Sequence, residues 1–247
     1  MFTARGETVQ WAEMLHNKPV LVQRGSFRPV TTATVDVQER ALEQFVSEAD
    51  VRGEDPAVLM EMTLRHLSRG DQIEEKDFLQ RADTLGALGR TVLISNFRRF
   101  HRLAYYLGRY TDRPIGLALG ASKLAEIFDE SFYNNKEGGL LGGLGLLFKN
   151  PGRLYVYPSL DEAAGAVITA ENFAAPAHLK HLYAHLLQNG SIRGVRNSRA
   201  DLLPIRARIV LEEIQAGNPD WEKKVPPAIV EVVKRKQLFG YAEAVVA

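Results

Sequence analysis

Four short apolar runs, each bounded by glycine, proline or polar residues, predict buried strands. They cover residues 20–24, 91–95, 115–119 and 154–157. None alternates cleanly between apolar and polar positions, which is typical of central strands that are covered on both faces. The pattern therefore predicts a sheet with helices on both sides.

Apolar residues at helical spacing fill the intervals between these runs. The helices predicted before residue 158 cover 35–49, 57–68, 77–88, 96–110 and 121–132. Asp55-Pro56 is interpreted as an N-cap followed by proline at the first position of the second helix. Strands and helices that alternate in this way form right-handed crossovers. We therefore predict an α/β fold, Rossmann-like, with a mostly parallel sheet and flanking helices.

The pattern changes beyond residue 158. Helices are predicted over 172–189, 200–216 and 219–239, with no convincing strand between them. We therefore expect two units. Residues 1–158 would form an α/β nucleotide-binding-like domain, and residues 159–247 a helical C-terminal subdomain.

Charge and composition exclude several classes of function for this protein. The 247 residues include 31 basic and 30 acidic ones, and this balance gives no sign of a nucleic acid partner. The absence of cysteine excludes disulfides, cysteine-bound metals and thiol nucleophiles. No window approaches the roughly 20 apolar residues that span a bilayer, and the N-terminus lacks a signal-peptide pattern. We expect a cytoplasmic protein that does not bind membranes.

Three of the predicted strands end in turns of small or polar residues that run into helices. In open parallel sheets, ligands bind beyond these carboxyl ends, where free N–H groups and helix dipoles favour an anion. The candidate ligand-binding residues are Gly25, Ser26, Arg28, Thr31, Thr32, Ser95, Asn96, Ser122 and Lys123. The alternative is that these residues only cap helices, as serine, asparagine and glycine commonly do. The sequence indicates no catalytic residue.

The first of these turns resembles the loop of nucleotidyltransferases, in which a strand is followed by Gly-x-Phe-(Asp/Asn)-Pro-x-His-x-Gly-His. Three positions of this pattern are kept: Gly25, Phe27 and Pro29. Four positions depart from it: Arg28, Thr31, Ala33 and Thr34, with the two threonines in place of the two histidines. In that family the histidines stabilise phosphates in the transition state, whereas threonine carries no positive charge. The resemblance implies a phosphate-binding loop with a degenerate catalytic motif.

A wider resemblance rests on segments spread from about residue 18 to 241: VQRGSFRPVT (22–31), GRTVLIS (89–95), RLAYYLGRYT (102–111), FDESFYNN (128–135), GRLYVYP (152–158), HLYAHLLQNG (181–190) and WEKKVPPAIVEVVK (221–234). Through these segments the chain resembles a bacterial family described as nicotinate-nucleotide-adenylyltransferase-like. Some members carry the label of TonB-dependent receptor, which we do not adopt because no apolar segment suits a membrane receptor. Members are longer, which implies that this chain is a C-terminal half or a short member.

Two functions follow as expectations. The first is binding of a nucleotide or phosphorylated small molecule, with magnesium-assisted nucleotidyl (adenylyl) transfer if the protein is an enzyme. The alternative is an inactive nucleotidyltransferase-like fold that serves as a structural or assembly partner, in contact with another protein or in a homo-oligomer.

Four further motifs have structural and functional interpretations. The first is a set of histidines at helical spacing: His178, His181 and His185. They suit a metal, but they also flank an apolar stripe, and we predict no metal site. Basic and aromatic residues mix in NFRRFHRLAYYLGRY (96–110), typical of single-strand binding or, as we prefer, of a core helix with a solvated face. The glycine-rich GGLLGGLGLLF (138–148) suits a flexible lid or a close-packed helix, and GSIR (190–193) weakly resembles a second nucleotidyltransferase motif.

Overall fold

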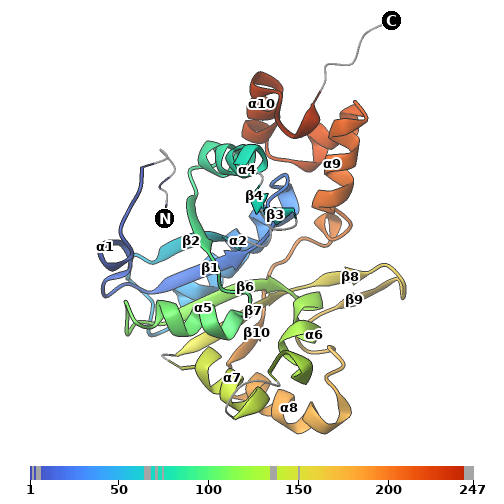
Figure 1. The fold of residues 1–247 in the computed structure, drawn as a ribbon. Coiled ribbons are helices and arrows are strands. Elements are labelled where there is room, and N and C mark those ends of the chain that lie inside the picture. Colours follow the sequence, from blue (N-terminus) through green and yellow to red (C-terminus); the bar gives the residue numbers. More distant parts are fainter. Residues whose placement is uncertain are drawn as a thin grey trace, which may run out of the picture.

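The computed structural model describes residues 1, 3, 7–63, 68–69, 72–73, 75–133, 138–149 and 151–241 (Figure 1). Its centre is a six-stranded parallel sheet. The strands are β1 (Val20–Arg24), β2 (Ala57–Thr63), β5 (Thr91–Ser95), β6 (Ile115–Gly120), β7 (Gly152–Tyr157) and β10 (Ile192–Gly194). They lie in the order β10-β7-β6-β1-β2-β5, which is 3-2-1-4-5-6 by position along the chain when the sheet is read from β5. This is the doubly wound order, and the direction of winding reverses between β1 and β6.

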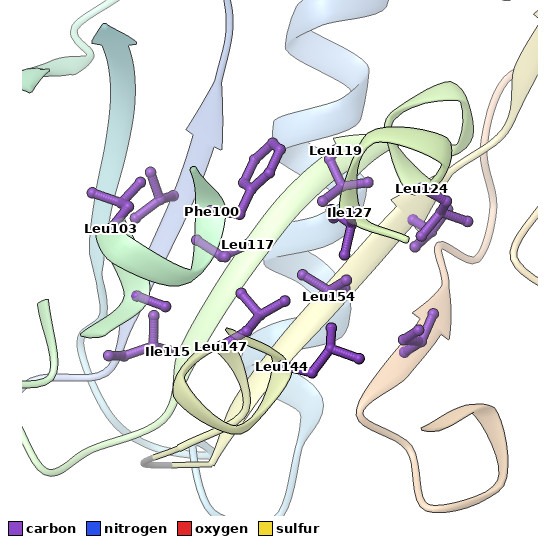
Figure 2. Close-up of a cluster of buried hydrophobic side chains, with 14 of the residues drawn as sticks. Phe100, Leu103, Ile115, Leu117, Leu119, Leu124, Ile127, Leu144, Leu147 and Leu154 are labelled. Carbon is purple, nitrogen blue, oxygen red and sulfur yellow. The ribbon is translucent and has the colours of Figure 1, made fainter. Parts of the chain in front are cut away.

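One face of the sheet carries Val22, Leu59 and Leu117, which lie side by side in register. Helices pack over this face and enclose a hydrophobic core, part of which is shown in Figure 2. They are α1 (Trp11–Leu15), α5 (Phe100–Leu107), α6 (Leu124–Ile127), α7 (Gly139–Leu147) and α8 (Lys180–Gln188), with the short 3-10 turns η1 (Ala121–Lys123), η2 (Glu130–Tyr133) and η3 (Ala177–Leu179).

The opposite face carries Leu21, Met60 and Tyr155 and is covered by α2 (Thr32–Ser47) and by the C-terminal helices. These are α9 (Ala207–Gln215) and α10 (Pro227–Lys236), which share a core cluster with α4 (Glu75–Ala87). The 3-10 turns η4 (Ala200–Leu202), η5 (Pro219–Lys224) and η6 (Leu238–Gly240) connect this layer. Two small hairpins complete the fold: β3 (Ser68–Arg69) with β4 (Gln72–Ile73), and β8 (Ser159–Asp161) with β9 (Ala166–Ile168).

The structure confirms the α/β fold, the four predicted strands and the C-terminal helices. The helix predicted over 57–68 is wrong, because Ala57–Thr63 is the strand β2, between β1 and β5. Leu59 packs in the core on one face of the sheet and Met60 in the core on the other, so this run lacks the polar face that a surface helix needs. Residues 64–67 lie outside the described part.

The expectation of no strand between the helices predicted beyond residue 158 is also wrong, because β10 lies between the first two of them. The hairpin β8–β9 follows β7 directly, and β10 pairs with β7 to complete the main sheet. Each of these strands has only three residues, which is too short to leave an apolar pattern. The sheet therefore takes strands from both sides of residue 158, and the division into two units there stays a prediction.

The glycine-rich segment 138–148 forms the helix α7, which decides between the two interpretations of this motif. A Cβ on Gly143 would overlap the ring of Tyr133. Glycine at this position lets α7 pack against η2, so the segment is a close-packed helix.

Candidate functional site: a cleft between β1 and β6

A cleft of about 850 Å³ opens at the carboxyl ends of β6 and β7, beside the first turn of α2. This is the place where the winding of the sheet reverses, the general ligand position in such folds. The volume lies in the range of sites for small molecules and cofactors. Residues from four segments form most of the lining: 31–37 at the start of α2, 120–125 after β6, 157–163 after β7, and 202–208 before and at the start of α9. Ile168 and Phe173 complete it.

The start of α2 is fixed by a reciprocal cap. Thr31, which is 2% exposed, accepts the N–H of Thr34 on its Oγ1 at 3.1 Å, and Thr34 Oγ1 accepts the N–H of Thr31 at 3.4 Å. The two hydroxyl oxygens lie 3.0 Å apart. The geometry of an α-helix leaves the N–H groups of Thr32 and Ala33 without an intrahelical acceptor. The first turn therefore offers N–H groups and the positive end of the helix dipole beside the cleft.

Replacing Thr31 by valine is expected to lower the free energy of unfolding by about 1 kcal/mol, because the cap is lost while the shape is kept. Urea unfolding followed by circular dichroism measures the change. Thr31→Ser keeps the hydroxyl and should cost much less. If serine costs as much as valine, the cap is not the cause.

The opposite wall contains a half-buried cation, Arg206, which is the N-cap residue of α9. Its Nη2 donates to the carbonyl oxygen of Leu160 at 2.9 Å and its Nη1 to that of Leu203 at 2.5 Å. Its Nε lies 3.2 Å from Oε1 of Glu162. Arg206 therefore joins the β8–β9 hairpin to the C-terminal layer at the edge of the cleft.

The floor of the cleft includes Tyr157, whose hydroxyl donates to Oδ2 of Asp36 at 2.5 Å. Asp36 is buried on α2 and also accepts from Arg40 and from the backbone N–H of Arg199. Burial, together with the hydrogen bond to Asp36, raises the pKa of Tyr157 above its usual value. At neutral pH this hydroxyl is a hydrogen-bond donor and not a base.

Comparisons with known proteins support the fold but give no family. No protein-family model matches the chain, and no curated protein matches it. Among solved structures, it is similar to the Plasmodium falciparum nicotinic acid mononucleotide adenylyltransferase complexed with APC. The TM-score is 0.52 at 12% identity, over 92% of this chain and 99% of that chain. The same enzyme complexed with NaAD gives a TM-score of 0.49, with the same identity and coverage.

The chain has a nucleotidyltransferase-like fold. At this identity the likeness concerns the fold alone, and the chemistry has to be argued from the residues.

Of the nine candidate residues predicted for ligand binding, Thr31 and Ser122 line the cleft. Ser122 donates its N–H to Oγ of Ser159 at 3.4 Å. Gly120 permits this close approach, because a Cβ there would lie 2.8 Å from the same oxygen. The turn after β6 is thus held against the segment that follows β7.

Three other candidates, Gly25, Ser26 and Arg28, lie in the loop before α2 but face other elements. Nε of Arg28 lies 2.6 Å from Oδ1 of Asp77 on α4. Asp77 also pairs with Arg81, and Arg81 Nη1 donates to the carbonyl oxygen of Ser26 at 3.0 Å. Gly25 donates its N–H to the carbonyl oxygen of Glu61. The loop is therefore fastened to α4 and β2, and Arg28 is engaged outside the cleft.

The remaining candidates are dispersed. Thr32 donates its hydroxyl to the carbonyl oxygen of Lys224 at 3.1 Å, and the exposed Lys123 lies 3.4 Å from Glu126. Ser95 is buried at the end of β5 and donates to Glu61, whereas Asn96 is exposed. The assignment of all nine residues to ligand binding stays a prediction.

The sequence interpretation missed Arg206, and the weak resemblance of GSIR to a second motif concerns a different arginine. Arg193 of that segment donates its Nε to the carbonyl oxygen of Gly190 at 2.7 Å and pairs with Glu48, just past the far end of α2. Pro204 could have indicated that the helix begins later, because proline does not suit the interior of the helix predicted over 200–216. The helix starts at Ala207 instead, which places Arg206 at its N-terminus.

Within the described ranges, no group of three or more histidine, aspartate or glutamate residues could hold a metal ion. His178 lies 2.8 Å from Glu130, and His185 lies 3.2 Å from the side-chain amide of Asn189. In the same part of the chain, none of the helices combines the length and apolar character that crossing a bilayer requires.

Proposed function

We propose that the protein binds a nucleotide or phosphorylated small molecule in the cleft between β1 and β6. The observation that carries this proposal is the capped first turn of α2, which borders an 850 Å³ cleft where the winding of the sheet reverses. A phosphate would accept from the N–H groups of Thr32 and Ala33, as at other helix N-termini. The solved neighbour of similar fold, an adenylyltransferase complexed with APC, supports this class of ligand.

The two walls of the cleft suit different parts of such a ligand. Arg206 supplies positive charge for phosphate. Its guanidinium would give up the ion pair with the exposed Glu162 and bind a phosphate oxygen instead. On the apolar side, Val37, Ile168 and Phe173 line the cleft and suit the flat faces of a base. Asp161 and Glu162 provide carboxylates, and magnesium is commonly held by one or two carboxylates together with substrate phosphates. Magnesium would therefore enter with the nucleotide and neutralise phosphate charge.

The reaction class that fits this site is nucleotidyl transfer with a degenerate catalytic loop. One observation favours the alternative, which is a catalytically inactive fold that acts as a structural or assembly partner. The hydroxyls of Thr31 and Thr34 bond each other's backbone in the cap, and neither side chain supplies the positive charge that phosphoryl chemistry requires. The two functions differ in whether a bound nucleotide is turned over.

Thermal unfolding with ATP, NMN, nicotinate mononucleotide and CTP, each with and without magnesium, tests binding. A ligand at a hundred times its dissociation constant should add about 2.7 kcal/mol of apparent stability. Arg206→Gln should weaken binding about tenfold or more, because a charge-assisted contact to phosphate is lost. The exposed Arg235→Gln, outside the cleft, is the matched control and should leave affinity unchanged.

No stabilisation by any of these nucleotides would refute the proposal. The variant Arg28→Ala distinguishes between two possible phosphate sites. If this variant abolishes binding and Arg206→Gln does not, the phosphate lies in the loop that the sequence predicted and not at the opposite wall. Once binding is established, release of pyrophosphate from ATP in the presence of either mononucleotide distinguishes an enzyme from a catalytically inactive protein.

A further inference from the structure

Exposed basic residues lie around a tyrosine on α5 and at the two ends of this helix. Arg102 and Tyr105 lie on α5, Arg98 lies just before the helix and Arg109 in the turn just after it, and all four are exposed. The inner face of the same helix belongs to the core, where Phe100 and Leu103 pack beside β6 (Figure 2). The sequence prediction of a core helix with a solvated face is therefore confirmed, and exposed arginines lie on that face and at both ends of the helix.

The charges of this surface are not neutralised within the described part of the chain. Arg98, Arg102 and Arg109 form no ion pair there, whereas the neighbouring Arg99 lies 3.6 Å from Glu126 and stacks 3.5 Å above the ring of Phe132. Lys149, which follows α7, adds a fourth cation, with its Nζ 5.9 Å from the ring centroid of Tyr105. Like charges gathered on one surface repel one another, so an anionic partner would stabilise this surface.

A small hollow of about 110 Å³ lies between α5 and α7 at one end of this surface. Ala104, Tyr105 and Leu146 give it an apolar base, and Arg109 and Lys149 form a cationic edge. The hollow is well below the size of a nucleotide site, and its volume suits one side chain of a partner. Arginine and tyrosine are also the residue types most enriched at protein interfaces.

We propose that this surface, the α5 basic surface, docks an acidic helical segment of another protein. Carboxylates of this segment would pair with the arginines, and one apolar side chain would enter the hollow beside Tyr105. The net charge of +1 favours a protein segment over nucleic acid, because the chain as a whole provides no long-range attraction for a polyanion. The site is separate from the β1–β6 cleft and does not depend on its function.

Fluorescence anisotropy with a designed peptide tests the proposal. The probe is a labelled helical peptide of about 20 residues, long enough to fold in water, with glutamates three and four residues apart along one face and one leucine beside them. A second peptide carries glutamine in place of each glutamate. The variant R98Q/R102Q/R109Q should bind the acidic peptide at least about tenfold more weakly than the unaltered protein, and binding should weaken as salt is raised.

The matched control is R52Q/R196Q/R235Q, which removes the same charge from exposed arginines elsewhere. It should bind like the unaltered protein, and unfolding curves of both variants should show that the fold is kept. Equal binding of the glutamine peptide, or an equal loss in the control variant, would overturn the proposal. Tighter binding of a single-stranded oligonucleotide through the same arginines would assign the surface to nucleic acid instead. Self-association that disappears in the R98Q/R102Q/R109Q variant would assign it to a second copy of this chain.

Discussion

Replacing Glu61 by alanine is expected to destabilise the protein by about 3–5 kcal/mol, because a buried guanidinium is left without its carboxylate. Glu61 lies on β2 and is fully buried. Arg24 on β1 donates its Nε to Oε2 of Glu61 at 2.5 Å and its Nη2 to Oε1 at 3.2 Å. The hydroxyl of Ser95 on β5 donates to the same carboxylate at 2.5 Å. Urea unfolding followed by circular dichroism measures the loss.

Two further variants separate the charge from the packing. Glu61→Gln keeps the shape and loses the charge, so it should also be strongly destabilised. The double variant Arg24→Met/Glu61→Leu removes both charges and should recover much of the stability, because apolar residues often replace a buried ion pair at little cost. If the double variant is as unstable as Glu61→Ala, the uncompensated charge is not the cause of the loss.

The same pair holds one edge of the fold in place. Arg24 Nη2 donates to the carbonyl oxygen of Phe97 at 2.7 Å, and Nη1 donates to that of Arg98 at 3.3 Å. The guanidinium also lies 4.7 Å from the centroid of the Phe100 ring. The ion pair thus links the carboxyl ends of β1, β2 and β5 to the start of α5. The Arg24→Met/Glu61→Leu variant should therefore leave the loop before α5 more open to hydrogen exchange, even where stability recovers.

Continuous apolar runs were enough to predict most of the sheet, because parallel strands are buried on both faces. The same property explains the error at Ala57–Thr63. Buried strands and buried helices have similar apolar patterns, and Asp55-Pro56 gave a false sign of a helix start. Glu61 is a charged residue within this apolar run, so the strand was harder to recognise from the sequence. Its partner Arg24 is 37 residues away in sequence, so the pairing that makes a buried glutamate tolerable shows only in the structure.

The candidate site was predictable where a strand leads directly into a helix. Thr31 and Ser122 follow β1 and β6, and the general rule for parallel sheets places them at the cleft. Arg206 reaches the cleft through a long connection after the three-residue strand β10. No local sequence pattern indicates this position. Arg28 looked like a phosphate ligand because its partner Asp77 belongs to α4, 49 residues later. Contacts that are distant in sequence therefore determined which of the predicted residues meet.

Replacing Trp221 by alanine is expected to cost about 3–5 kcal/mol, the usual loss for a fully buried tryptophan. Trp221 lies in η5 and is 1% exposed. Its core cluster unites the C-terminal layer, including Val210 and Ile229, with Met60 of the sheet and with Phe27 of the loop before α2. Because the cluster crosses residue 158, the cavity should destabilise the sheet together with the C-terminal helices. We expect a single cooperative transition, shifted to lower denaturant.

Trp11→Ala is the matched control, because Trp11 is the other of the two tryptophans and is only partly buried. Its ring lies 5.0 Å from that of Tyr106 and 6.0 Å from that of Tyr110, so its removal should cost clearly less. In each variant the remaining tryptophan reports on unfolding by fluorescence. If residues 159–247 were an independent unit, Trp221→Ala would lower only one of two transitions, and the Trp11 signal would keep its original midpoint. Coincident midpoints for fluorescence and circular dichroism would instead show that the sheet and the C-terminal layer unfold as one body.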